Sequence, residues 1–242
     1  MQSSDQTSLD NLQSLLNESE TTLQILVDKS SQLQKLYRED AAALKSCAET
    51  RQQTQQILQS QLDERIIKER LQQFAAAISH SWTSSNIQKS LDDFFQDMLK
   101  VMSVLQSKIN AHKESIHAVY NLFQARHHLG LIEPQAYSMQ ASLDSLKQIA
   151  QQTAGIASTM KLITHSSRSI RNKFEQQIAL PCTNLLTQMH RELNQWLEDS
   201  VRPLDDQIED QRYQLDKILN ELKTLTEARE KIKDKTEFIK QS

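Results

Sequence analysis

The chain has 242 residues, of which only two are glycine and three are proline, and 38% of them are hydrophobic. Average usage would be about 7% glycine and 5% proline, and both β-hairpins and dinucleotide-binding folds depend on glycine in their turns. The formal net charge of −3 argues against a general nucleic-acid binder, because such proteins are basic overall. The composition therefore predicts an almost entirely helical protein with no nucleic-acid partner.

The cysteines and the uncharged windows bear on the cellular compartment. Cys47 and Cys182 lie far apart without metal-ligand spacing, and we interpret both as ordinary small apolar residues. Residues 1–10 lack the basic and apolar stretches of a secretory signal. The uncharged windows at 72–88 and 148–160 contain many Gln, Ser and Thr residues and fall short of an apolar membrane span. We expect a cytoplasmic protein, with any membrane contact peripheral and at the inner surface.

The first segment, residues 1–78, reads as one long helix or a helical hairpin, because no Gly or Pro occurs between residues 8 and 74. Apolar residues at two positions of a seven-residue repeat indicate a coiled-coil seam. These residues are Leu9, Leu12, Leu16, Leu23, Leu26, Leu33, Tyr37, Leu44, Cys47 and Leu58. Polar residues interrupt the seam at Ser19, Ser30, Asp40, Arg51 and Thr54.

The central segment, residues 87–200, is predicted to hold several helices after a polar break at 79–86. The helix over 87–128 carries one apolar stripe, made of Leu91, Phe94, Phe95, Met98, Met102, Leu105 and Ile109, which is typical of a buried core face. Gly130 and Pro134 end that helix. Further helices are expected over 135–152 and 166–200. The small residues around Gly155 are either an interruption or a close-packing point.

Two prolines mark the last helices. Pro181 lies within the expected helix 166–200 and should kink it, because proline has no backbone N–H to donate. Pro203 begins the last segment, residues 203–242, where apolar residues repeat at two positions of a heptad apart from Gln211. The predicted coiled-coil seam consists of Leu204, Ile208, Leu215, Ile218, Leu222, Leu225, Ile232 and Ile239. A helix with such a seam needs a partner helix.

The run from Phe174 to Ile232 resembles the helical C-terminal region of bacterial dynamin-like proteins. The matching positions are a Trp-Leu pair, a Pro-Leu step, a Gln-Ile pair and a leucine-rich helix: Trp196, Leu197, Pro203, Leu204, Gln207, Ile208, Leu215, Leu219 and Leu222. The resemblance covers about a quarter of the chain and implies a stalk-like helical module that self-associates and contacts a GTPase partner or a membrane surface.

The chain lacks the GxxxxGK[ST] loop through which dynamin-family members bind GTP, so GTP binding is not implied. The chain would then be a stalk without its motor, either a fragment or a partner lacking a GTPase domain. Glu114 and His117 form an ExxH step, but a di-iron bundle needs a second such step and two further carboxylates. His127 and His128 are adjacent and point to different faces of a helix. We expect no enzyme activity, no cofactor and no metal.

A basic cluster is the candidate contact with anionic lipid or an acidic partner. It consists of Lys161, Arg168, Arg171 and Lys173, and each well-placed cation near an anionic membrane contributes about 1 kcal/mol. The alternative is an ordinary solvated face. Trp82, in the polar break, either folds back onto the bundle or presents its ring to a membrane or partner. These five residues form the predicted contact site.

Taken together, the patterns predict an all-α fold, in which residues 1–242 form a single elongated helical bundle of about four to six helices with long antiparallel coiled-coil-like layers. The expected function is a non-catalytic assembly or stalk module that forms homo-oligomers. The alternative is a coiled-coil scaffold or adaptor with no membrane role. A pore-forming bundle would need a clearly apolar hairpin, which the sequence lacks.

Overall fold

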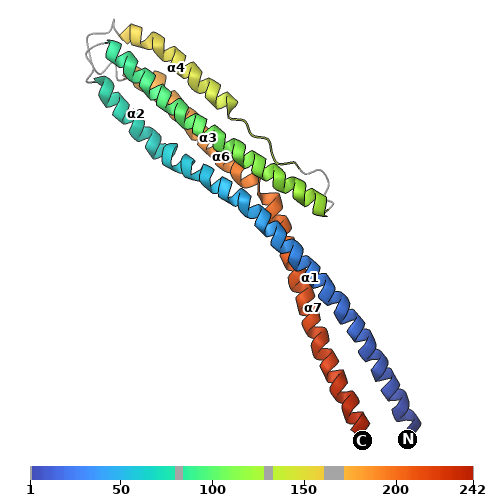
Figure 1. Cartoon of the computed structure of the whole chain (residues 1–242). Helices are drawn as coiled ribbons and strands as arrows, with labels where there is room; N and C mark the ends of the chain where they lie inside the picture. The colour runs from blue at the N-terminus through green and yellow to red at the C-terminus, as the bar shows by residue number, and fades with distance from the viewer. Residues whose placement is uncertain (1, 80–83, 128–132, 161–171, 242) are drawn as a thin grey trace. The chain divides into compact units, whose positions relative to one another are not determined.

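A computed structural model describes residues 2–79, 84–127, 133–160 and 172–241. Every regular element among these residues is a helix (Figure 1). The predicted all-α helical-bundle fold is therefore confirmed. By its internal contacts the chain divides into two compact units. We call residues 1–44 with 203–242 the coil unit, and residues 45–202 the bundle unit.

The bundle unit is a ring of four helices supported by the last part of a fifth. Its members are α2 (Glu64–Ser79), α3 (Ser84–His127), α4 (Gln140–Met160) and α6 (Leu180–Asp199). Helix α3 packs against α2 and α4, and α6 packs against the same two helices (Figure 1). Helix α1 (Gln2–Gln61) contributes its residues from Lys45 onward.

The core of the bundle unit is made by the apolar stripes of these helices. Leu91, Met102, Leu105 and Ile109 of α3 are fully buried, and Phe95 and Met98 nearly so. Helix α6 adds further buried residues, namely Cys182, Leu186, Met189, Leu193, Trp196 and Leu197. Full burial of one such side chain contributes roughly 1.5–3 kcal/mol. The stripe predicted between Leu91 and Ile109 is thus the inner face of α3.

The first difference from the sequence prediction is a break between α1 and α2. Residues 1–78 were predicted to form one long helix or a helical hairpin, whereas α1 ends at Gln61 and α2 begins at Glu64. The carboxylate of Asp63 accepts a hydrogen bond of 2.9 Å from the backbone N–H of Arg65, which caps the first turn of α2. Leu62, within the break, and Ile67, in the first turn of α2, remain buried.

A second difference concerns the residues before α4. The helix was predicted from Gln135, but it begins at Gln140. The carbonyl groups of the intervening stretch have tertiary partners instead of helical ones: Trp196 Nε1 donates to Gln135 O at 2.7 Å, and Lys113 Nζ donates to Tyr137 O. Helix α4 then continues through Gly155, so the small-residue patch does not interrupt it.

Pro181 has the local effect that its chemistry predicts. The helix before it widens into a π-helical turn, η1 (Glu175–Ala179), in which Leu180 N–H donates to Glu175 O, five residues earlier. Pro181 then occupies the start of α6. A wider turn keeps the proline ring away from the preceding carbonyl groups and absorbs the missing donor.

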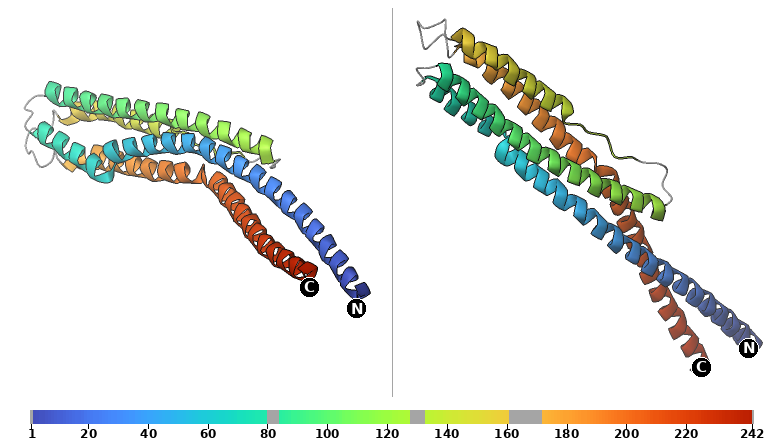
Figure 2. Two further views of the ribbon diagram at one scale, coloured as in Figure 1. Left: turned by 60° about the horizontal axis from the view of Figure 1, so that its bottom comes forward. Right: turned by 45° about the horizontal axis from the view of Figure 1, so that its top comes forward.

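The coil unit consists of two antiparallel helices. Helix α7 (Arg202–Gln241) runs along residues 2–44 of α1, and the end of α7 lies beside the start of α1 (Figure 2). Two polar contacts fix the register: Gln211 Nε2 donates to Asp40 Oδ2 at 2.9 Å, and Arg229 pairs with Glu20 at 2.9 Å. The residue numbers of facing positions therefore sum to about 250.

The structure places the predicted seam of α7 on its inner side. Each of the following is buried or half-buried: Leu204, Ile208, Leu215, Ile218, Leu222, Leu225, Ile232 and Ile239. The polar interruptions are inside as well, because Ser30, Asp40, Gln211 and Thr236 are all buried. A seam with such polar layers specifies its register at a cost in stability.

Replacing both Asp40 and Gln211 by leucine is expected to stabilise the coil unit by about 1–2 kcal/mol, because an apolar pair fills the seam without desolvating a carboxylate. Gln211→Leu alone is expected to destabilise it, because the Asp40 carboxylate loses that donor. Thermal unfolding followed by circular dichroism compares both variants with the wild type. A double variant less stable than the wild type would contradict the prediction.

Candidate functional site

Most of the predicted contact site lies outside the described residues. Trp82, Lys161, Arg168 and Arg171 belong to segments that the structure does not describe. Lys173 is described and is half-buried, next to Phe174, which is 1% exposed. The basic cluster therefore stays a prediction from the sequence.

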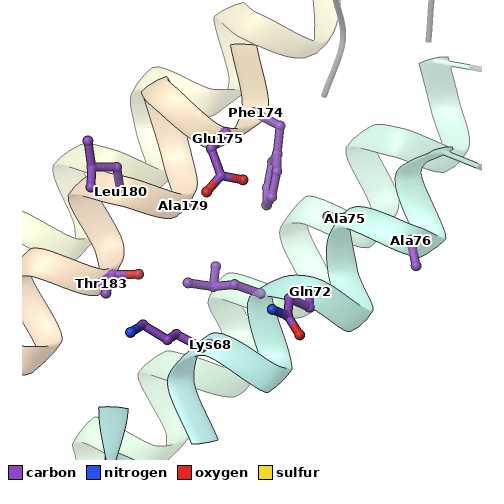
Figure 3. Close-up of a pocket in the computed structure, with 10 residues that line it drawn as sticks. Lys68, Gln72, Ala75, Ala76, Phe174, Glu175, Ala179, Leu180 and Thr183 are labelled. Carbon is purple, nitrogen blue, oxygen red and sulfur yellow. The ribbon is translucent and has the colours of Figure 1, made fainter. Parts of the chain in front are cut away.

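A groove of about 490 Å³ lies between α2 and the π-helical turn, close to Lys173 in the sequence. Lys68 and Gln72 of α2 form one wall, and Glu175 and Thr183 lie on the other (Figure 3). Lys68 Nζ contacts Glu64 on its own helix at 2.5 Å. A lysine on one wall and a glutamate on the other give the groove no net charge, so its electrostatics favour neither an anion nor a cation.

A buried polar network surrounds His112 in the bundle unit. The imidazole Nδ1 is 2.9 Å from Thr50 Oγ1 of α1, and Nε2 is 3.2 Å from Ser200 Oγ, just after α6. The ring of Trp196 meets the imidazole edge to face at 5.3 Å. Tyr120 Oη donates to Ser200 O at 3.1 Å. The network therefore joins α1, α3 and the end of α6.

The centre of the network is closed to solvent, whereas Thr50 at its edge is half-buried. His112 and Ser200 are both 0% exposed, so the Ser–His pair cannot reach a substrate in this conformation. Burial, with a smaller effect of the nearby Arg51 charge, lowers the pKa of His112 from 6.5 to about 4. A neutral imidazole donates from one nitrogen and accepts at the other, so it satisfies one hydroxyl in each role. This arrangement holds the bundle together.

Sequence reasoning missed this network, although a signal was present. The apolar stripe of α3 was followed only to Ile109, yet His112 continues it at helical spacing, and Ile116 and Phe123 follow on the same buried side. A histidine on a core stripe needs hydrogen-bond partners. Thr50 and Ser200 are separated from it by 62 and 88 residues, so the sequence does not identify them.

The cysteines and the ExxH step show no arrangement for chemistry. Cys47 and Cys182 are both buried free thiols, and burial raises the pKa of each, to about 12 for Cys182. Glu114 and His117 are exposed on α3. Over the described ranges, no group of three or more His, Cys, Asp or Glu side chains could hold a metal ion.

The coil unit carries a second groove, of about 680 Å³, along one side of its two helices. Thr22 and Leu26 of α1 line it, together with Tyr213, Lys217 and Thr224 of α7. Tyr213 is 72% exposed, which is unusual for a large aromatic side chain. The groove is therefore an apolar surface edged by charged residues, the composition typical of a contact with another protein.

No protein family, curated protein or solved structure matches the chain. Along the described helices, none is both long enough and apolar enough to cross a bilayer.

Proposed function

We propose that the chain is a non-catalytic helical assembly module that works by self-association through its coil unit. The observation that carries the proposal is the distribution of exposed apolar side chains. Eight large apolar side chains are exposed in the described part of the chain, and six of them belong to the coil unit. These six are Leu15, Ile25, Val27, Tyr213, Leu219 and Phe238.

The interior of the coil unit supports the same proposal. Among its described residues, only Leu204 and Ile218 are buried apolar side chains, whereas four polar side chains are buried. Two helices alone bury a narrow seam, and most helical stability in proteins comes from packing an apolar face against a neighbour. A second pair of helices would remove the exposed apolar side chains from water and widen the core.

A stalk of the bacterial dynamin-like kind, in contact with a GTPase partner or a membrane surface, is one setting for such a module and rests on the sequence alone. Two residues of that resemblance have packing roles, since Trp196 is buried against His112 and Leu204 lies in the seam of the coil unit. The alternative function is a coiled-coil adaptor whose coil unit binds a different protein.

Light scattering on the 242-residue chain as it elutes from a size-exclusion column tests the proposal. One copy has a mass of 27.9 kDa, and self-association predicts a mass of two or more copies, about 56 kDa or above, at micromolar concentration. A single-copy mass up to the highest soluble concentration would contradict self-association and favour the adaptor.

A further inference from the structure

The groove of the coil unit is part of a longer face that both helices share. Residues three, four and seven apart lie on one side of a helix. On α1 this spacing joins Thr22 and Leu26 of the groove to Leu15, Glu18, Ile25 and Lys29. On α7 it continues the groove from Thr224 to Ala228, Lys231, Lys235 and Phe238. We call this side the groove face.

The following inference rests on the proposed self-association and names its surface. We propose that two copies meet through their groove faces with the same ends together, so that α1 of each copy lies on α7 of the other. The product is a four-helix unit with a two-fold axis parallel to the helices. Each copy contributes the same surface, as a two-fold interface requires.

Charge complementarity indicates a second copy as the occupant. The first twenty residues carry four acidic side chains and no basic one, whereas residues 231–241 carry four lysines, Lys231, Lys233 and Lys235 among them, against Asp234 and Glu237, a net charge of +2. In the register of the coil unit, Glu18 is level with residue 232. Across the two-fold, Glu18 of one copy therefore faces Lys231 and Lys235 of the other. Complementary charges of this kind select the partner and fix its orientation.

The same register matches two further pairs of positions. Lys29 is level with Glu221, which lines the groove, so this pair brings opposite charges together between copies. Leu15 is level with residue 235, close to Phe238, so two exposed apolar side chains meet at the other end. Both pairs use side chains that are exposed in the single copy.

The main alternative is the antiparallel arrangement, in which the two-fold axis is perpendicular to the helices and opposite ends of the two copies lie together. It lays α1 on α1 and α7 on α7, and it removes the acidic start of α1 from the lysine-rich end of α7. The arrangement with the same ends together is therefore favoured by the net charges of the helix ends.

Cross-linking at two neutral positions tests the orientation. Gln214→Cys and Ala228→Cys lie on the row of Glu221, and their separation of 14 positions spans about 21 Å along the helix. Cys47 and Cys182 are buried with raised pKa values, so both react slowly and stay in place. With the same ends together, the α7 helices of the two copies lie diagonally opposite each other in the four-helix unit, about 14 Å apart. In each variant, a bismaleimide about 14 Å long should then join the introduced cysteine of one copy to the same cysteine of the other copy. If only one or neither is cross-linked, the orientation is overturned.

Substitutions on the groove face test the surface itself. Ile25→Asp is expected to weaken dimerisation at least tenfold, because it places a carboxylate in the contact. Val104→Asp is the matched control, since Val104 is 51% exposed on α3 of the bundle unit against 61% for Ile25, and it should leave the dimer unchanged. A dimer that survives Ile25→Asp would overturn the surface but leave self-association standing. A wild-type chain that is monomeric would overturn both.

Charge reversal tests the pairing between copies. Glu18→Lys should weaken dimerisation about tenfold at low salt, and adding Lys231→Glu and Lys235→Glu should restore it, because the opposite charges then face each other again. Failure of the triple variant to recover, with unchanged helix content by circular dichroism, would overturn the arrangement with the same ends together.

Discussion

His112→Ala is expected to lower the free energy of unfolding of the bundle unit by about 3–5 kcal/mol. The substitution leaves a cavity beside Trp196, whose ring contacts the imidazole at 5.3 Å. It also removes one hydrogen-bond partner from each of two hydroxyl groups, that of the half-buried Thr50 and that of the fully buried Ser200. Urea unfolding near pH 7.5, followed by tryptophan fluorescence, to which Trp82 and Trp196 both contribute, and by circular dichroism, measures the loss.

His117→Ala is the matched control for this prediction. His117 lies five residues further along α3 and is exposed, so its removal should change stability by less than about 0.5 kcal/mol. Equal losses for the two variants would show that the effect does not come from the buried network, since alanine is the better helix former at both positions. No loss in either would show that the network around His112 contributes nothing to folding.

The helical class could be predicted because it depends on local chemistry. A chain with two glycines and three prolines has few sites where the backbone can form a tight turn at low energetic cost. The heptads of α7 specify one inner side along 40 residues. The core stripe of α3 was predictable for the same reason, because its period is that of a single helix. These features require no knowledge of which helices become neighbours.

The helix boundaries that differ depend on partners distant in the sequence. The stretch before α4 is not helical because Trp196 and Lys113 take its carbonyl groups, at separations of 61 and 24 residues. The break at Asp63 has a local signal, an aspartate before an acidic first turn, but an apolar pattern that continues on both sides obscures it. Local propensity gives no means of choosing between these outcomes.

The polar interruptions of the seams show the same limit. Asp40 and Gln211 each interrupt a seam in the sequence, and only the antiparallel register shows that they meet. Thr54 and Ser30 instead donate to carbonyl groups of their own helix, at Thr50 and Val27, and this satisfies them while buried. Two kinds of polar layer thus look alike in the sequence. Only the layer that pairs α1 with α7 carries information on register.

The stability of the bundle unit is expected to fall by about 2 kcal/mol between pH 7 and pH 5, and by roughly 3 kcal/mol at pH 4, through His112 alone. Burial lowers the pKa of His112 from 6.5 to about 4 in the folded chain. Above pH 6.5 the imidazole is neutral in both states, so its full contribution is present. As the pH falls toward 4, the unfolded chain takes up a proton that the folded chain resists, and the contribution is lost.

Urea unfolding of the wild type and of His112→Ala is compared at several pH values between 7.5 and 4. The difference between the two free energies of unfolding gives the contribution of His112 protonation. Exposed histidines and carboxylates titrate in both proteins, so their effects cancel in the difference. The wild type should lose its advantage over the variant progressively below pH 6.5. If the two curves stay parallel, the folded chain protonates His112 as readily as the unfolded one. The imidazolium would then be stabilised inside the network, because the hydroxyl oxygens of Thr50 and Ser200 can accept from both ring N–H groups while donating to the carbonyl groups of Cys47 and Leu197.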